Sequence, residues 1–195
     1  GTQDITAFVQ VFPNDDGTCE VLSHFWTPAE TLAERSRRDQ VDYQHWVDLG
    51  VMTATPGPVI DTRQVARDVI ALAERFDIRE IAYDRWGASE TRLNLEDAGL
   101  TVVDMGQGYA SMSAPTKGML DLVMSRKLRH GGHPVLRWMA DNLVVRTDPS
   151  GNMKPDKEKS RQKIDGMAAL IMALDRAMRN GHGQSVYETE SLLVI

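Results

Sequence analysis

Two aspartates stand at positions from which they could share divalent metal ions. Asp84 closes the apolar run of residues 78–84, and Asp165 lies at the start of a strongly helical stretch. A strand carries its last side chain to the rim of a sheet, and a helix crossing that rim can bring a second carboxylate to the same place. Oxygen ligands suit Mg²⁺ or Mn²⁺. Two such ions activate water and stabilise the leaving oxygen in phosphodiester hydrolysis, which is the chemistry that this pair predicts.

Basic residues crowd the segment that leads to Asp165. They are Arg146, Lys154, Lys157, Lys159, Arg161 and Lys163, with three acidic residues interspersed. Beside a metal site such cations would contact phosphate, and Lys159 and Lys163 would also lower carboxylate pKa values. Lys117, close to Ser113 and Thr116 at an expected helix start, is a further candidate phosphate contact. The alternative is that all of them are solvated surface charges.

Composition excludes several classes of protein. The 195 residues are 42% hydrophobic and 26% charged, typical of a folded soluble domain, and the net charge of −6 argues against a nonspecific coat on nucleic acid. The single cysteine, Cys19, allows no intrachain disulfide and favours a reducing compartment. There is no apolar run long enough to cross a membrane and no signal-peptide character at the start, so we expect a cytosolic protein.

The order of expected elements indicates an α/β fold. Residues 5–12 and 19–25 form a predicted hairpin around the turn at 14–17. Thr27 and Glu30 suggest a capping box that starts a helix, which breaks near 39–42 and ends at Gly50. Asp61 should cap the next helix, with Gln64 as its partner. The strand at 78–84, a helix at 89–98 and a strand at 100–105 then form a βαβ-type alternation.

The second half completes this pattern. We expect helices at 115–128, 133–142 and 157–179, a hairpin turn at 148–152, and a docked strand at 191–195. Antiparallel strands, then parallel strands, then a helix returning an acid to the sheet is the order of the ribonuclease H-like fold. The predicted organisation is one such domain over residues 1–180, with a mixed central sheet flanked by helices, and a tail over 181–195.

Several separate motifs resemble one known family, the C-terminal nuclease domain of tailed-phage large terminase subunits. They occur in the family's order over nearly the whole chain, at residues 81–86, 107–117, 128–139 and 154–166. The resemblance implies a metal-dependent endonuclease that cuts concatemeric viral DNA during packaging into a procapsid, in the cytoplasm of a bacterial host. It assigns Asp84 and Asp165 as metal ligands.

The same resemblance implies a third aspartate in a first strand just ahead of the part that matches Thr2 to Ala7. That stretch is missing from this sequence, and Asp4 is the nearest substitute as a ligand. No P-loop motif occurs, so the family's ATPase domain must lie elsewhere. The resemblance also implies double-stranded DNA, a small terminase subunit and a portal ring as partners.

Two other readings stay open. One is a different ribonuclease H-like nuclease of the resolvase or integrase type. The other is a DNA-binding or assembly module with an incomplete catalytic site. Zinc is not expected at His130 and His133, because no cysteine or third histidine accompanies them at useful spacing. Trp86, directly after the strand-end acid, is expected to order the turn or line the site.

Overall fold

A mixed sheet forms the centre of the molecule. The computed structural model describes residues 4–85, 89–180 and 191–194. The sheet has the order β3-β2-β1-β9-β4-β5, and β6 pairs with β2 outside this path. Its strands are β1 (Thr6–Pro13), β2 (Cys19–Pro28), β3 (Thr53–Thr55), β4 (Ile78–Asp84), β5 (Val102–Met105), β6 (Leu128–Arg129) and β9 (Ser191–Val194). The β1–β2 and β1–β9 pairs are antiparallel, whereas β4 runs parallel to both β5 and β9.

The predicted hairpin and docked strand are confirmed. Gly17 has a φ of +81°, which a glycine adopts without strain, and the Thr18 N–H donates to Asp16 Oδ1 at 2.9 Å. The turn therefore holds β1 against β2 over eight register pairs. The strand at the chain's end is β9, and it lies between β1 and β4 rather than at an edge.

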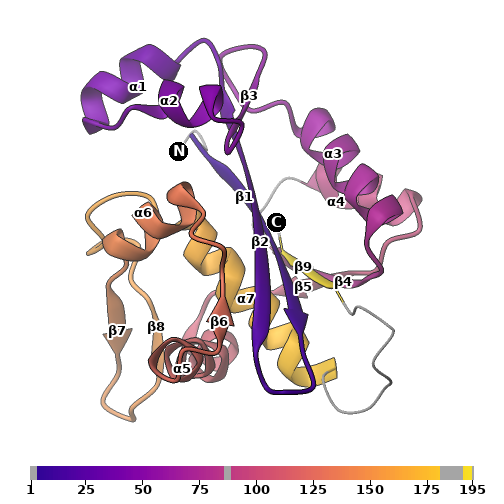
Figure 1. Cartoon of the computed structure of the whole chain (residues 1–195), viewed down its shortest axis with the longest axis vertical. Coiled ribbons are helices and arrows are strands. Elements are labelled where there is room, and N and C mark those ends of the chain that lie inside the picture. Colours follow the sequence, from indigo (N-terminus) through magenta and orange to yellow (C-terminus); the bar gives the residue numbers. More distant parts are fainter. Residues whose placement is uncertain (1–3, 86–88, 181–190, 195) are drawn as a thin grey trace.

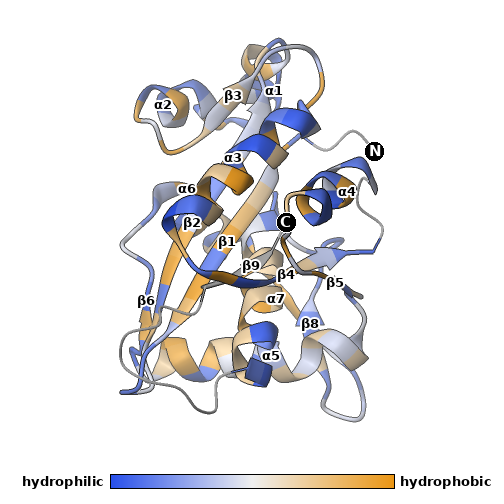
Figure 2. Ribbon diagram, turned by 90° about the vertical axis from the view of Figure 1, so that its right-hand side faces the viewer, coloured by the Kyte–Doolittle hydropathy of each residue, from blue (hydrophilic) through white to orange (hydrophobic). Residues whose placement is uncertain are grey.

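Helices cover both faces of this sheet (Figure 1). One face packs against α5 (Tyr109–Met124), α6 (Pro134–Asn142) and α7 (Asp165–Asn180), and the other against α3 (Thr62–Arg75) and α4 (Ser89–Asp97). Strand β1 is buried on both sides because Ala7, Val9 and Val11 enter the first core and Phe8 enters the second. Accordingly β1 is largely hydrophobic along its length (Figure 2). The α/β prediction and the flanking helices are confirmed.

The capping box predicted at Thr27 is wrong. Thr27 and Pro28 are the last residues of β2, where they pair with β3, and the helix α1 (Leu32–Asp39) begins only after Thr31. Thr27 Oγ1 donates to the Asp4 carbonyl at 2.9 Å instead of capping a helix. The predicted break after Asp39 is confirmed, since a separate helix, α2 (Tyr43–Asp48), follows it.

Two helix boundaries also differ from prediction. Helix α5 begins at Tyr109 and contains Pro115 inside it, whereas the sequence suggested a start at Pro115; Leu128 belongs to β6. Helix α7 begins only at Asp165, because residues 157–162 form turns and bends after the small hairpin of β7 (Val145–Thr147) and β8 (Met153–Pro155). The Asp61 N-cap is confirmed, with its carboxylate accepting from the Arg63 and Gln64 N–H groups at 3.0 and 3.2 Å.

One histidine makes the stability of the fold dependent on pH. His24 lies on β2 beneath α3, and its Nε2 is 3.0 Å from Gln10 Oε1. Burial, with the nearby His133 and Arg75, lowers the pKa of His24 from 6.5 to about 4. The unfolded chain therefore binds a proton more readily than the folded chain between these two values.

We expect the stability contributed by neutral His24 to be fully present above pH 6.5 and to be lost as the pH falls towards 4. The loss between pH 7 and pH 5 should be about 2 kcal/mol. Urea unfolding of the parent and of His24→Gln at both pH values measures it, since glutamine cannot titrate. Equal pH dependence in the two proteins would contradict this account.

Candidate active site

Asp84 is the last residue of β4 and lies half-buried at the carboxyl end of the parallel strands. It pairs in register with Met105 of β5, and the next N–H, that of Arg85, donates to the Met105 carbonyl at 3.4 Å. The predicted strand boundary at Asp84 is confirmed exactly as expected from the apolar run that precedes it. Trp86, predicted to order the following turn, lies outside the described residues.

Asp165 is the first residue of α7 and is partly buried. Burial raises the pKa of its carboxyl above the usual value; Lys157 and Lys163 offset part of the rise, and Asp4 adds to it. Ionising Asp165 is therefore less favourable than ionising an exposed aspartate, and nearby positive charge favours it. A bound divalent cation would supply that charge, so this environment suits a metal ligand.

The fold brings Asp84 and Asp165 to the same end of the sheet. At the opposite end, Arg176 Nε lies 2.7 Å from Glu80 Oε2, and Asn180 Nδ2 donates to the same oxygen at 3.1 Å. These contacts join the first half of β4 to the last turns of α7. Lys163, two residues before α7, lies 3.4 Å from Asp4, two residues before β1, and β1 runs opposite to β4 because it is antiparallel to β9 while β4 is parallel to β9. The end of β4 and the start of α7 therefore lie at the same end of the sheet.

No third acid from β1 stands beside Asp84. Val9 of β1 and Ala82 of β4 both pair with Val194 of β9. Because β1 and β4 run in opposite directions, two residues back along β1 is Ala7 and two residues forward along β4 is Asp84, so Ala7 lies level with Asp84. The position between β1 and β4 belongs to β9. Among the described residues no group of three histidine, cysteine or acidic side chains gathers into a metal site.

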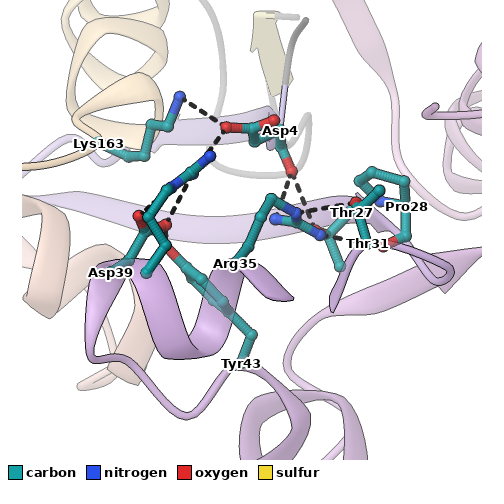
Figure 3. A network of polar contacts seen from close by, with 9 residues as sticks. Asp4, Thr27, Pro28, Thr31, Arg35, Asp39, Tyr43 and Lys163 are labelled. Atoms are coloured by element: carbon teal, nitrogen blue, oxygen red, sulfur yellow. Dashed lines mark hydrogen bonds and ion pairs between the residues drawn. The ribbon is translucent and has the colours of Figure 1, made fainter. Parts of the chain in front are cut away.

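Asp4 lies in a bend before β1 and is held by cations from two elements (Figure 3). Its Oδ2 is 3.2 Å from an Arg38 guanidinium nitrogen and 3.4 Å from Lys163 Nζ, and its side chain is 17% exposed. The Asp4 carbonyl accepts from Arg35 at 3.1 Å. To serve as a metal ligand, the Asp4 carboxylate would have to exchange these ion pairs for the metal.

The cations around Asp4 belong to a larger polar network that sequence analysis missed. Arg38 also lies 2.7 Å from Asp39 Oδ1, and Asp39 Oδ2 accepts from the Tyr43 hydroxyl at 2.9 Å. The Asp39 carbonyl accepts from Gln162 Nε2 at 2.8 Å. The network ties α1 to the segment that precedes Asp165. No local pattern signals it, because its two parts, residues 4–43 and residues 162 and 163, are separated by more than a hundred residues in the sequence.

We expect Asp4→Asn to change plasmid cleavage by less than about tenfold and to lower the pKa of Asp165. The Asp4 carboxylate neutralises Lys163 and Arg38 and opposes ionisation of Asp165, so removing its charge should make Asp165 easier to ionise. Stability should fall by about 1 kcal/mol or less, as is usual for partly exposed ion pairs. Cleavage assays measure the first effect, the pH dependence of the rate the second, and urea unfolding the third. A loss of cleavage of about a hundredfold or more would instead indicate that Asp4 is a metal ligand.

The predicted phosphate contacts differ in their surroundings. Lys117 and Lys159 are exposed, Lys154 Nζ lies 4.9 Å from the centre of the Tyr109 ring, and Lys163 is paired with Asp4. Buried Asp156, which sequence analysis did not single out, accepts from the Glu158 and Lys159 N–H groups, both at 3.1 Å. It folds this segment into a turn whose lysines face outward.

His130 and His133, at which zinc was not expected, make a turn hydrogen bond and an aromatic contact, respectively. His130 Nδ1 accepts from the Gly132 N–H at 3.1 Å, and the ring of His133 lies 5.2 Å from that of Phe25. Tertiary packing therefore accounts for His133, and a local turn for His130.

A mixed sheet with helices on both faces and an acid at its carboxyl rim is the architecture of ribonuclease H-like nucleases. The sequence model of the family described as the terminase large subunit, endonuclease domain, matches residues 1–181 of this chain, and the chain belongs to this family. The large terminase subunit of Enterobacteria phage HK97 is 38% identical over 176 residues, which are 89% of this chain and 35% of that protein. Protein YmfN of Escherichia coli K12 is 34% identical over 179 residues, 89% of this chain and 38% of that one.

The crystal structure of the HK97 large terminase superposes with a TM-score of 0.84, covering 90% of this chain and 37% of that one. The ribonuclease H-like fold is thereby confirmed. The chain spans little more than a third of the length of these relatives. No helix among residues 4–85 and 89–180 is long and apolar enough to cross a membrane.

Proposed function

We propose that this domain is a metal-dependent DNA endonuclease that cuts concatemeric viral DNA during genome packaging. The observation that carries the proposal is that the chain belongs to the terminase endonuclease family. Asp84 at the end of β4 and Asp165 at the start of α7 support it. The proposed partners are double-stranded DNA, an ATPase domain of the same terminase, a small terminase subunit and the portal.

Asp84 and Asp165 would hold the metal, Mg²⁺ or Mn²⁺, since both offer the hard oxygen donors that these ions prefer. The partly buried setting of Asp165, which raises the pKa of its carboxyl, fits a ligand whose charged form a bound cation would stabilise. Bound metal would supply an activated water and stabilise the leaving oxygen. The exposed Lys117 and Lys159, together with Lys154, would contact phosphates of the DNA backbone. Lys163 is already paired with Asp4 and would contribute less to phosphate binding.

Supercoiled-plasmid cleavage tests the proposal. With Mg²⁺ or Mn²⁺ we expect closed circles to become nicked and then linear, because an endonuclease needs no free end, and we expect chelator to stop the reaction. DNA that stays intact with either metal would contradict it.

A second function has one observation in its favour, the absence of a three-acid cluster among the described residues. On that account the domain binds DNA or assembles with partners without cutting. It would shift DNA in a gel equally well with metal and with chelator and would never nick. The two functions are thus separated by measuring binding and cleavage on the same plasmid.

A further inference from the structure

Helix α6 contacts the start of α7 on both sides of Asp165. The side chain of Asn142, the last residue of α6, donates from Nδ2 to the Lys163 carbonyl at 3.2 Å. One turn earlier in α6, Met139 Sδ accepts from the Gly166 N–H at 3.0 Å. Asn142 is 8% exposed and Met139 is fully buried. The backbone is therefore held from the interior two residues before Asp165 and one residue after it.

The Lys163 carbonyl receives its hydrogen bond from Asn142 and not from the helix that follows. The Met167 and Ala168 N–H groups both donate to the Ile164 carbonyl, at 2.9 and 3.0 Å. Among residues 4–85 and 89–180, no backbone N–H donates to the Lys163 carbonyl. A buried amide such as that of Asn142 is costly unless it is hydrogen-bonded, so this contact is what makes its burial tolerable.

The other contacts of this segment hold its side chains. Lys163 Nζ lies 3.4 Å from Asp4 Oδ2, on a side chain that is 36% exposed (Figure 3). Gln162 Nε2 donates to the Asp39 carbonyl at 2.8 Å. Partly exposed ion pairs contribute little to holding a structure in place. The buried contacts with α6 are therefore the ones that fix the path of the backbone into α7.

The direction of a metal ligand depends on such support. Asp165 is the first residue of α7, so its carboxylate moves with the backbone of residues 163–166. Groups that orient a ligand without touching the metal affect metal affinity nearly as strongly as the ligands do. An amide suits this task because it carries no charge, and an added charge would itself attract or repel the cation.

We propose that Asn142 is a positioning residue, which fixes the Asp165 carboxylate for metal binding through the Lys163 carbonyl. This role rests on the proposed function. Asn142 is not needed to close its own helix, because the Leu143 N–H donates to the Ala140 carbonyl at 3.2 Å. Its side chain reaches α7 instead, 21 residues further along the chain.

Mn²⁺ binding to the domain without DNA, measured by calorimetry, tests the proposal. Asn142→Ala and Asn142→Leu both remove the donor, and leucine keeps the branched shape of asparagine. We expect each to weaken Mn²⁺ binding by about tenfold or more. Val69→Ala is the matched control, because it removes packing from a fully buried residue of α3 in the core on the other face of the sheet. It should change the affinity by less than about twofold.

Amide hydrogen exchange separates positioning from a general loss of stability. In the Asn142 variants the Gly166 amide should exchange about tenfold faster, while the amides in the last turn of α7 keep the parental rate, since local opening exposes only the first turn. Val69→Ala should not speed the Gly166 amide selectively.

The proposal is overturned if a folded Asn142 variant binds Mn²⁺ as tightly as the parent, or if Val69→Ala weakens binding as much. Failure of both Asn142 variants to fold would overturn it too, because Asn142 would then serve the fold itself. A parent domain that binds no Mn²⁺ would overturn both this role and the proposed function. A parent that binds Mn²⁺ without cutting plasmid would overturn the proposed function alone.

Discussion

Asp84→Asn and Asp165→Asn should each reduce metal-dependent plasmid cleavage by about a hundredfold or more. Each change removes a negative charge and a metal-binding oxygen with little change in shape, and a metal supplies several kcal/mol of transition-state stabilisation. Initial rates at saturating Mg²⁺ or Mn²⁺ measure the effect. Asp97→Asn, an exposed aspartate of α4 away from this end of the sheet, is the matched control and should cut at the parental rate.

A stability measurement separates this role from a structural one. Because burial raises the pKa of Asp165, the charged carboxylate disfavours the folded state in the absence of metal. Asp165→Asn should therefore melt at the same temperature as the parent or higher, while losing activity. A lower melting temperature together with retained cleavage would show that Asp165 supports the fold and not the reaction.

The raised pKa of Asp165 also sets the sign of a pH effect. The carboxyl must ionise to bind metal, so at limiting metal the cleavage rate should rise with pH through its pKa. Raising the metal concentration should shift that rise to lower pH, because metal competes with the proton. A rate at limiting metal that does not change with pH, or that falls as the pH rises, would contradict this linkage.

Gly166→Val should destabilise the domain by about 3 kcal/mol and slow cleavage as well. A Cβ at Gly166 would lie 2.8 Å from Cε1 of Phe25 and 3.0 Å from Sδ of Met139, and Phe25 is only 2% exposed. The ring has no room to move, so the first turn of α7 must shift, at the upper end of the usual cost of overpacking. Asp165 belongs to that turn and would shift with it.

Urea unfolding and plasmid cleavage of the same preparation measure the two effects. Gly118→Ala is the matched control, since a Cβ there would meet only the end of the Met178 side chain, at 3.2 Å, and Met178 is 52% exposed. That side chain can move, and alanine favours a helix interior, so a gain of about 0.5 to 1 kcal/mol is expected. Equal effects of the two substitutions would exclude close packing at Gly166 as the cause.

Local patterns in the sequence determined several elements. The apolar run at 78–84 predicted β4 to the residue, the turn at Gly17 predicted the hairpin, and Asp61 predicted its helix cap. These elements depend on interactions between near neighbours, namely strand alternation, a glycine φ and a side chain bound to the next turn. Asp84 could be selected as a rim acid for the same reason.

The tertiary structure decided what depends on distant partners. Thr27 carries a capping pattern, yet pairing with β3 and the hydrogen bond to Asp4 hold it in a strand. Pro115 lies inside α5 although proline usually marks a helix start. The ion pairs of Asp4 with Arg38 and Lys163, and the central place of β9, join residues far apart in the chain. Such contacts form only once the sheet and helices pack, so no short stretch of sequence encodes them.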